Sequence, residues 1–255
     1  MKSSKYFIAS FVISIFLVGC SEESVTDQFE DANGKVPEKF IKTITTESYK
    51  NYEGDGLLTI EYNTDGSVST VTDGTNRNIF VYEKQQLKTI TGTGDNFLFK
   101  DAYNSPYSAF EKGDVVARDD NGNPSLIEFY EEEFDYDENA YVPVVYTLDI
   151  FYDSQPNPYY YTMEAGGLIE VMDNVKLSLN LGAQSTEVIQ ARLLFPVNNI
   201  SQMIYKDGNG EIQYTIDANY VYDQDGYPTS ATVTVDSIWD DEDVSYLVQY
   251  TYMGQ

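Results

Sequence analysis

The chain has 255 residues with a formal charge of −27, no histidine, a single cysteine and 23 tyrosines. Such an acidic balance repels nucleic acid, and a chain without histidine cannot form a Ser/His/Asp triad or most zinc sites. Because one cysteine cannot form a disulfide within the chain, the fold has to be stabilised by a hydrophobic core.

Residues 1–19 have the features of an export signal. Lys2 and Lys5 precede the apolar run "YFIASFVISIFLV" at residues 6–18, as in secretory signal peptides. The run is shorter than the roughly 20 residues that span a bilayer as a helix. The sequence "LVGC" that ends at Cys20 resembles the lipobox of bacterial lipoproteins, which implies cleavage before Cys20 and lipidation of its sulfur. An ordinary signal peptide followed by a stray thiol is the alternative.

Residues 20–38 are expected to comprise the lipidated cysteine and a disordered acidic tether, since residues 21–37 are polar, acidic and poor in apolar side chains. The "SEES" directly after Cys20 resembles the short acidic signal that sends Bacteroidota lipoproteins to the outer leaflet of the outer membrane. We therefore expect a protein anchored by lipid to the outer membrane at the cell surface, with the periplasmic face as the alternative. The membrane is thus a partner through the N-terminal lipid alone.

Residues 39–255 are predicted to form a single antiparallel β domain, because one sequence pattern recurs along them. Tyr62 and Tyr222 are each followed, three and four places on, by Asp-Gly. Looser copies occur at Asn121-Gly122, at Gly208 and Gly210, and around Tyr82, where the glycine is missing. Alternating apolar and polar residues that run into Asp-Gly or Asn-Gly are typical of β-hairpins. Each copy therefore predicts a turn that reverses one strand and starts the next.

The predicted fold class is mainly β: an extended or curled antiparallel meander sheet of hairpin repeats, with closure toward a barrel left open. Runs rich in Val, Ile, Thr, Tyr and Phe predict strands at residues 59–62, 78–82, 126–130, 142–152, 176–181, 201–206, 211–221, 229–236 and 244–252. At most one short helix is expected, at residues 167–175, where apolar residues follow helical spacing. Pro156 and Pro158 predict a loop before it.

The repeat pattern is similar to the YD-type repeats of bacterial cell-surface proteins. The segments "FYDSQPNPYY", "FPVNNISQMIYKDGNGE" and "YVYDQDGYPTSATV" resemble Bacteroidota lipoproteins of unknown function with a porin-like, sheet-rich fold, over about residues 55–253. This resemblance implies an extended antiparallel sheet and brings no catalytic residues with it.

No pattern in the sequence points to a cofactor, a metal or a catalytic residue. Glycosidases use two carboxylates held at a defined separation, and among 42 Asp and Glu residues nothing in the sequence sets such a pair. A calcium-binding EF-hand loop needs Gly at position six. Counted from Asp119 this position is Pro124, and counted from Asp207 it is Ile212. We therefore expect a non-catalytic protein.

Exposed aromatic side chains are the strongest candidates for binding. Tyr159, Tyr160 and Tyr161, with Asn157 in the same predicted loop, would form a platform on which a sugar ring can stack, and Trp239 is a second candidate. Core or edge packing is the alternative for each of them. The predicted function is a surface binding module for a glycan or an envelope protein. The alternatives are an assembly role through strand-edge pairing and a carrier of an apolar ligand within a curled sheet, and nucleic acid is not expected as a partner.

Overall fold

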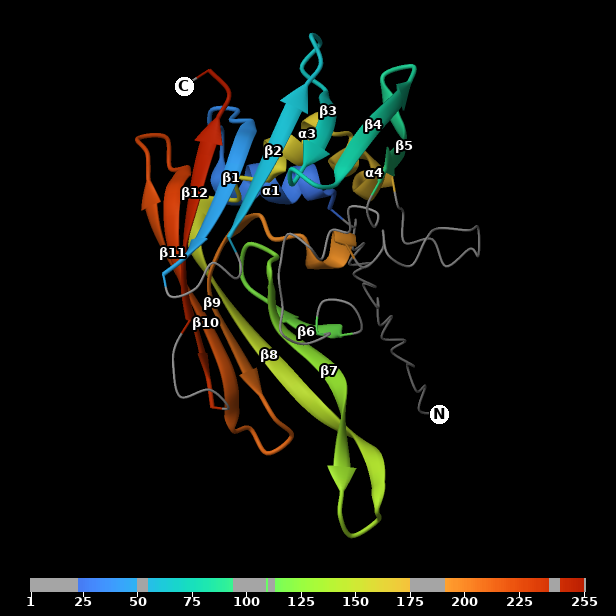
Figure 1. Ribbon diagram of the computed structural model, residues 1–255, viewed down its shortest axis with the longest axis vertical. Coiled ribbons are helices and arrows are strands. Elements are labelled where there is room, and N and C mark those ends of the chain that lie inside the picture. Colours follow the sequence, from blue (N-terminus) through green and yellow to red (C-terminus); the bar gives the residue numbers. More distant parts are fainter. Residues whose placement is uncertain are drawn as a thin grey trace, which may run out of the picture.

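In the computed structural model, twelve antiparallel strands form one open, strongly twisted sheet (Figure 1). The structure describes residues 23–49, 55–93, 109, 113–174, 191–238 and 244–254. The strands are β1 (Ile41–Ser48), β2 (Gly56–Tyr62), β3 (Val68–Thr72), β4 (Arg77–Glu83), β5 (Gln86–Gly92), β6 (Asp114–Arg118), β7 (Pro124–Asp135), β8 (Ala140–Pro156), β9 (Asn198–Lys206), β10 (Ile212–Tyr222), β11 (Pro228–Ser237) and β12 (Val244–Tyr252). The mainly β meander predicted from the sequence is confirmed.

The sheet consists of two meanders that meet at its centre. Its order is β5-β4-β3-β2-β1-β12-β11-β10-β9-β8-β7-β6. The first and last strands are thus neighbours, with Ile41 opposite Tyr252 and Ser48 opposite Tyr246. β5 and β6 are the two edges, and among the described strands they do not pair, so the sheet is not closed into a barrel.

The Asp-Gly and Asn-Gly repeats are hairpin turns, as predicted, and four of them share one geometry. In the β10–β11 turn the Asp223 N–H donates to the Tyr227 carbonyl at 2.9 Å, and the Gly226 N–H donates to the Asp223 carbonyl at 3.2 Å. Glycine alone has positive φ there, 83° at Gly226, so each turn is a type I turn followed by a glycine bulge. The Asp or Asn before each glycine does not have positive φ.

The hairpin without glycine, β4–β5, uses a different turn. Lys84 and Gln85 have φ of 55° and 70°, and Glu83 pairs with Gln86 across the turn. This is a two-residue turn with positive φ at both central positions, where Asn-Gly is the favoured sequence. Local strain therefore remains in this hairpin.

Three helices cover one face of the sheet (Figure 1): α1 (Val25–Asn33), α3 (Tyr160–Ala165) and α4 (Leu168–Asn174). Only α4 was predicted. α1 occupies the segment expected to be a disordered tether, and α3 lies in the segment expected to be a loop. Both expectations were wrong because short helices are stabilised mainly by tertiary packing, which local composition does not reveal.

α1 is held in place by a capping box, by buried side chains and by a hydrogen bond to α4. Ser24 and Asp27 form a reciprocal capping box, and Val25 and Phe29 are buried with 2% and 1% of their surface exposed. Asp173 of α4 accepts the Val25 N–H at 2.6 Å. α1 is therefore part of the folded domain.

All but one of the strand ranges predicted from the sequence overlap an observed strand. Four strands, β1, β3, β5 and β6, lie outside the residue ranges predicted as strands, and the strand expected at residues 176–181 lies outside the described residues. The core has three parts: one under β7–β10, one among the helices and one under β1–β4. Among the described helices, none is long and apolar enough to cross a membrane.

Candidate functional site

The tyrosine-rich segment predicted as a binding platform packs the helices onto the sheet. Asn157 is 3% exposed and its side-chain amide donates to the Pro196 carbonyl at 2.6 Å. Its side-chain oxygen accepts the Tyr159 N–H at 2.9 Å. Tyr160 is 2% exposed and its ring stacks on Phe29 of α1 at a centroid distance of 3.7 Å. Neither Asn157 nor Tyr160 is therefore available to a ligand in this structure.

The other two tyrosines of this segment are partly buried. Tyr161 packs edge-on against Phe29 at 5.6 Å, and Tyr159 packs edge-on against Tyr250 of β12 at 6.4 Å. Burial raises the pKa of both Tyr159 and Tyr250. The structure thus brings the four residues together, but as core and not as an exposed platform. Trp239 and Cys20, the other predicted site residues, lie outside the described residues.

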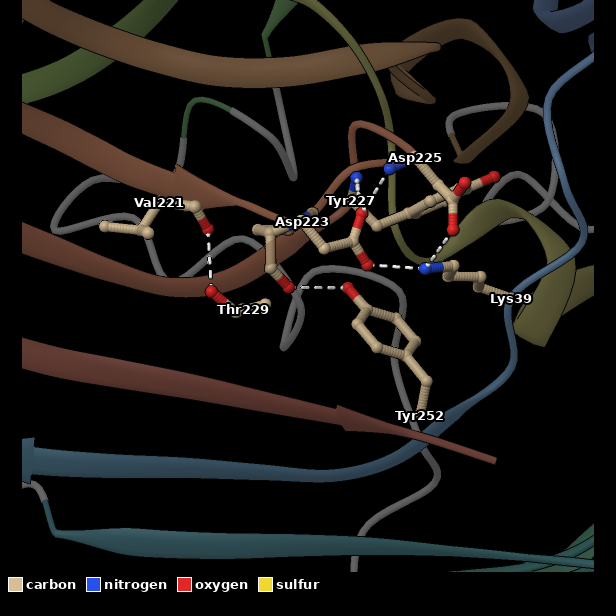
Figure 2. A network of polar contacts seen from close by, with 8 residues as sticks. Lys39, Val221, Asp223, Asp225, Tyr227, Thr229 and Tyr252 are labelled. Carbon is tan, nitrogen blue, oxygen red and sulfur yellow. Dashed lines mark hydrogen bonds and ion pairs between the residues drawn. The ribbon is translucent and has the colours of Figure 1, made fainter. Parts of the chain in front are cut away.

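Lys39 forms a polar network that joins the segment before β1 to the β10–β11 turn (Figure 2). Its Nζ lies 2.5 Å from the Asp223 Oδ2 and 2.8 Å from the Asp225 Oδ2. The same nitrogen lies over the rings of Tyr227 and Tyr252, at 5.5 and 5.8 Å from their centroids. Cation–π attraction adds to the ion pairs at this distance.

The charges of this network stabilise one another. Burial alone would lower the pKa of Lys39, but hydrogen bonds and charge from Asp223 and Asp225 outweigh it, so the pKa is raised. Burial would raise the pKa of Asp223, but its bonds to Lys39 and to backbone N–H groups outweigh it, so that pKa is lowered. The ammonium group is thus committed to two carboxylates.

A shallow hollow beside this network is lined by Glu38, Gln224, Met253 and the network residues. Its one cation is already paired, so the hollow offers a ligand a mainly acidic rim. No group of three or more His, Cys, Asp or Glu side chains that could hold a metal occurs in the part of the chain that the structure describes. We assign the Lys39 network a structural role, which sequence reasoning missed because its members are 184 residues apart.

The outer end of the β7–β8 hairpin projects from the sheet and forms the lower end of the molecule in Figure 1. β6 pairs with β7 only as far as Glu128, and β9 pairs with β8 only from Thr147 onward. Between these points β7 and β8 pair with each other, from Tyr130 opposite Val145 to Asp135 opposite Ala140. We call residues 130–146 the arm. No described strand flanks it on either side.

One face of the arm carries apolar side chains that are exposed. Tyr130 and Val145 are 61% and 40% exposed, and Phe134 and Tyr141 are 37% and 69% exposed. Each is a cross-strand pair, and the two pairs lie on the same face because positions alternate along a strand. Pro143, opposite Glu132, lies between them. We call this set of five residues the apolar stripe: Tyr130, Phe134, Tyr141, Pro143 and Val145.

The stripe is turned away from the core. Ile127 and Phe129, which alternate with it along β7, have no exposed surface and belong to the core cluster beneath the sheet. At the tip, Tyr136 is 88% exposed and packs edge-on against Phe134 at 5.1 Å, while Tyr141 meets the same ring at 5.3 Å. These contacts give the tip a defined aromatic cluster.

The arm is also strongly acidic. It contains no Lys or Arg and six acidic residues: Glu131, Glu132, Glu133, Asp135, Asp137 and Glu138. Asp135 caps the turn by accepting the N–H groups of Asp137 and Glu138 at 2.7 and 3.1 Å. The sequence signal for this surface is strand length, since β7 and β8 have 12 and 17 residues but their outer neighbours β6 and β9 only 5 and 9.

Two crystal structures are similar to this chain. One is of a porin-like protein from Bacteroides uniformis ATCC 8492, 14% identical with a TM-score of 0.35, covering 86% of this chain and 100% of the other. The second is of a porin-like protein from Bacteroides vulgatus ATCC 8482, 12% identical with a TM-score of 0.35, covering 85% and 100%. No protein-family model and no curated protein matches this chain.

The porin-like description agrees with the resemblance expected from the sequence. Likeness at this level of identity and superposition assigns no function to the chain. The YD-type repeat family and lipoprotein status remain predictions.

Proposed function

We propose that this chain is a non-catalytic, lipid-anchored protein of the bacterial outer membrane that binds another envelope protein through the arm. The observation that carries the binding role is the apolar stripe, which lies on a hairpin that projects beyond its neighbouring strands. Contiguous exposed apolar surface on a protein commonly marks an interaction site. The lipid anchor rests on the sequence that ends at Cys20.

The absence of histidine from the whole sequence supports a non-catalytic role, because histidine is the commonest general acid and base. The Lys39 network supports it too, since its ammonium group is held by two carboxylates and is not presented to a ligand.

The arm supports this function better than the alternatives considered from the sequence. An apolar ligand inside a curled sheet would need interior space, and the described helices fill the covered face with a packed core. Strand addition is disfavoured along the arm because charged residues and proline, here Glu131–Glu133 and Pro143, discourage edge pairing. A glycan platform at residues 157–161 would need Asn157 and Tyr160, which are buried.

Site-specific crosslinking in intact cells tests this function. A photoreactive phenylalanine derivative replaces Tyr136, and in a control strain it replaces Tyr49, which is 62% exposed outside the arm. We expect a discrete adduct with an envelope protein from position 136 and none of that mass from position 49. Equal patterns from both positions, or no adduct from position 136, would contradict the proposed binding role.

Lipidation is tested separately by the intact mass of the mature protein. We expect a chain that begins at Cys20 and carries acyl groups, and a Cys20→Ser variant that is not processed. An unmodified thiol would overturn the anchor without affecting the crosslinking result.

A further inference from the structure

We infer that the arm recognises a cationic, amphipathic protein segment, in which apolar side chains cover the stripe and Arg or Lys side chains meet the carboxylates around it. This inference rests on the proposed binding role of the arm and adds the chemistry of its partner. Three features of the arm support it: the arrangement of the stripe, the charge around it, and the edges that flank it.

The stripe is matched in size to a short segment. Tyr130 and Phe134 are four residues apart on β7, which corresponds to about 14 Å along a strand. Their partners Val145 and Tyr141 double its width. Such a surface accommodates two or three apolar side chains of one helix or strand, each of which would be desolvated on contact.

The charge of the arm selects a cationic partner. Six carboxylates and no basic residue lie within residues 130–146, so an acidic partner or an anionic lipid headgroup would be repelled. Arginine suits this surface in particular, because a guanidinium ion both pairs with carboxylates and stacks on aromatic rings. The aromatic cluster of Phe134, Tyr136 and Tyr141 provides those rings. Glu132 lies on the same face of β7 as the stripe, because side chains alternate along a strand.

The edges of the arm direct the partner to its face. Three consecutive glutamates lie on β7 and Pro143 lies on β8, and both features oppose main-chain pairing with another strand. Recognition therefore depends on side chains of the stripe, and substitutions there that leave the charge unchanged should weaken it.

The test uses the mature, lipidated protein in detergent and a fluorescein-labelled octapeptide of alternating Arg and Leu as the probe. The arm variant is Tyr130→Ser with Tyr141→Ser. The control variant is Ile212→Ser with Val221→Ser, two residues that are 49% and 59% exposed outside the arm. All three proteins have the same net charge, so non-specific attraction of the peptide to an acidic protein is equal among them.

We expect the arm variant to bind the probe about tenfold more weakly than wild type, because two aromatic contacts are lost, and the control variant to bind within about twofold. Binding should weaken as salt is raised, since the carboxylates are exposed. Far-ultraviolet circular dichroism and thermal unfolding are used to check that each variant is folded. Because none of the four substituted residues belongs to the three core clusters, we expect both variants to remain folded.

A second pair of variants tests the charge. Glu132→Gln with Glu138→Gln removes two charges from the arm, and Glu47→Gln with Asp236→Asn removes two exposed charges elsewhere. We expect a larger loss of affinity from the arm pair. Equal affinities in either comparison, or binding of an alternating Glu and Leu octapeptide as tight as that of the probe, would overturn the inference.

The outcome is separable from that of the proposed function. Crosslinking from position 136 without probe discrimination would mean that the arm binds a partner of another chemistry, for example a neutral glycoprotein. Failure of both would remove the binding role itself.

Discussion

At the scale of single residues, Lys39 shows how one side chain can join parts of the fold that are distant in sequence. It ties the segment before β1 to the β10–β11 turn through Asp223 and Asp225. Its side chain is 13% exposed, so removing the cation leaves two partly buried carboxylates close together. Removing only one partner of a partly buried ion pair destabilises the fold, because the remaining charges are left without compensation.

We predict that Lys39→Met lowers the free energy of unfolding by about 1–3 kcal/mol near neutral pH, less than for a fully buried pair because the site opens to solvent on one side. The folded pKa of Asp223 is lowered, so its contribution is present above the unfolded pKa of about 4 and is lost as pH falls through the folded value. The pKa of Lys39 is raised, so the contribution is present below about pH 10 and is lost at higher pH.

The difference between wild type and Lys39→Met should therefore be largest between about pH 5 and 9, and should shrink in acid as the carboxylates protonate. Urea unfolding across this range measures it. Lys42→Met, at an exposed position on β1, is the charge-matched control and should change stability by less than about 0.5 kcal/mol. A difference that does not depend on pH would show that packing, and not charge, accounts for the effect.

At the scale of elements, the hairpins differ in how well their turn residues suit the turn. Five of the described hairpin turns place a glycine at positive φ, whereas the β4–β5 turn places Lys84 and Gln85 there. A side chain at positive φ costs roughly 1–2 kcal/mol. A single substitution to glycine in this turn is therefore expected to relieve part of that cost.

We predict that Gln85→Gly stabilises the protein by about 1 kcal/mol, because glycine adopts a φ of 70° without steric cost. Thr89→Gly, in the adjoining strand β5 at an exposed position without positive φ, should instead destabilise it by roughly 0.5–1 kcal/mol. Thermal unfolding of both variants measures whether each is more or less stable than wild type. A loss of stability at both positions would show that the Gln85 backbone is not strained.

At the scale of the whole molecule, the docking of α1 sets how the domain would sit on a membrane. α1 is fixed to the domain by buried Phe29 and by the bond from the Val25 N–H to Asp173. If Cys20 is lipidated as proposed, only residues 21–23 separate the lipid anchor from the helix cap at Ser24. Four residues span at most about 14 Å. The domain is then held close to the bilayer at α1, which lies in the upper part of the molecule in Figure 1, whereas the arm forms its lower end.

We predict that, in vesicles with a headgroup-labelled energy acceptor, a donor attached at Glu30→Cys on α1 is quenched more than one at Tyr136→Cys on the arm. Insertion of a 12-residue Gly-Ser linker after Glu23 adds a flexible chain of about 20 Å average span and should reduce quenching at position 30 most. Equal quenching at the two positions before insertion would contradict this orientation. The lipid mass of each variant provides the control.

The hairpins could be predicted from the sequence because their cause is local. In the turn at Asp223, the carboxylate accepts the N–H groups of Asp225 and Tyr227 at 2.9 and 3.0 Å, and Gly226 provides positive φ. All of these residues lie within five positions, so they specify a turn wherever the rest of the chain goes. The strands that flank such turns follow for the same reason.

The remaining features depend on contacts between residues far apart in sequence. Tyr160 is core and not platform because α1, more than 120 residues earlier, stacks Phe29 on its ring. The arm projects because β6 and β9 end before it does. The sequence by itself therefore determined the local reversals and the β class. Only the tertiary structure decided the pairing of β1 with β12, the docking of α1 and which aromatic side chains meet solvent, because burial is a property of the assembled sheet and helices and not of any one segment.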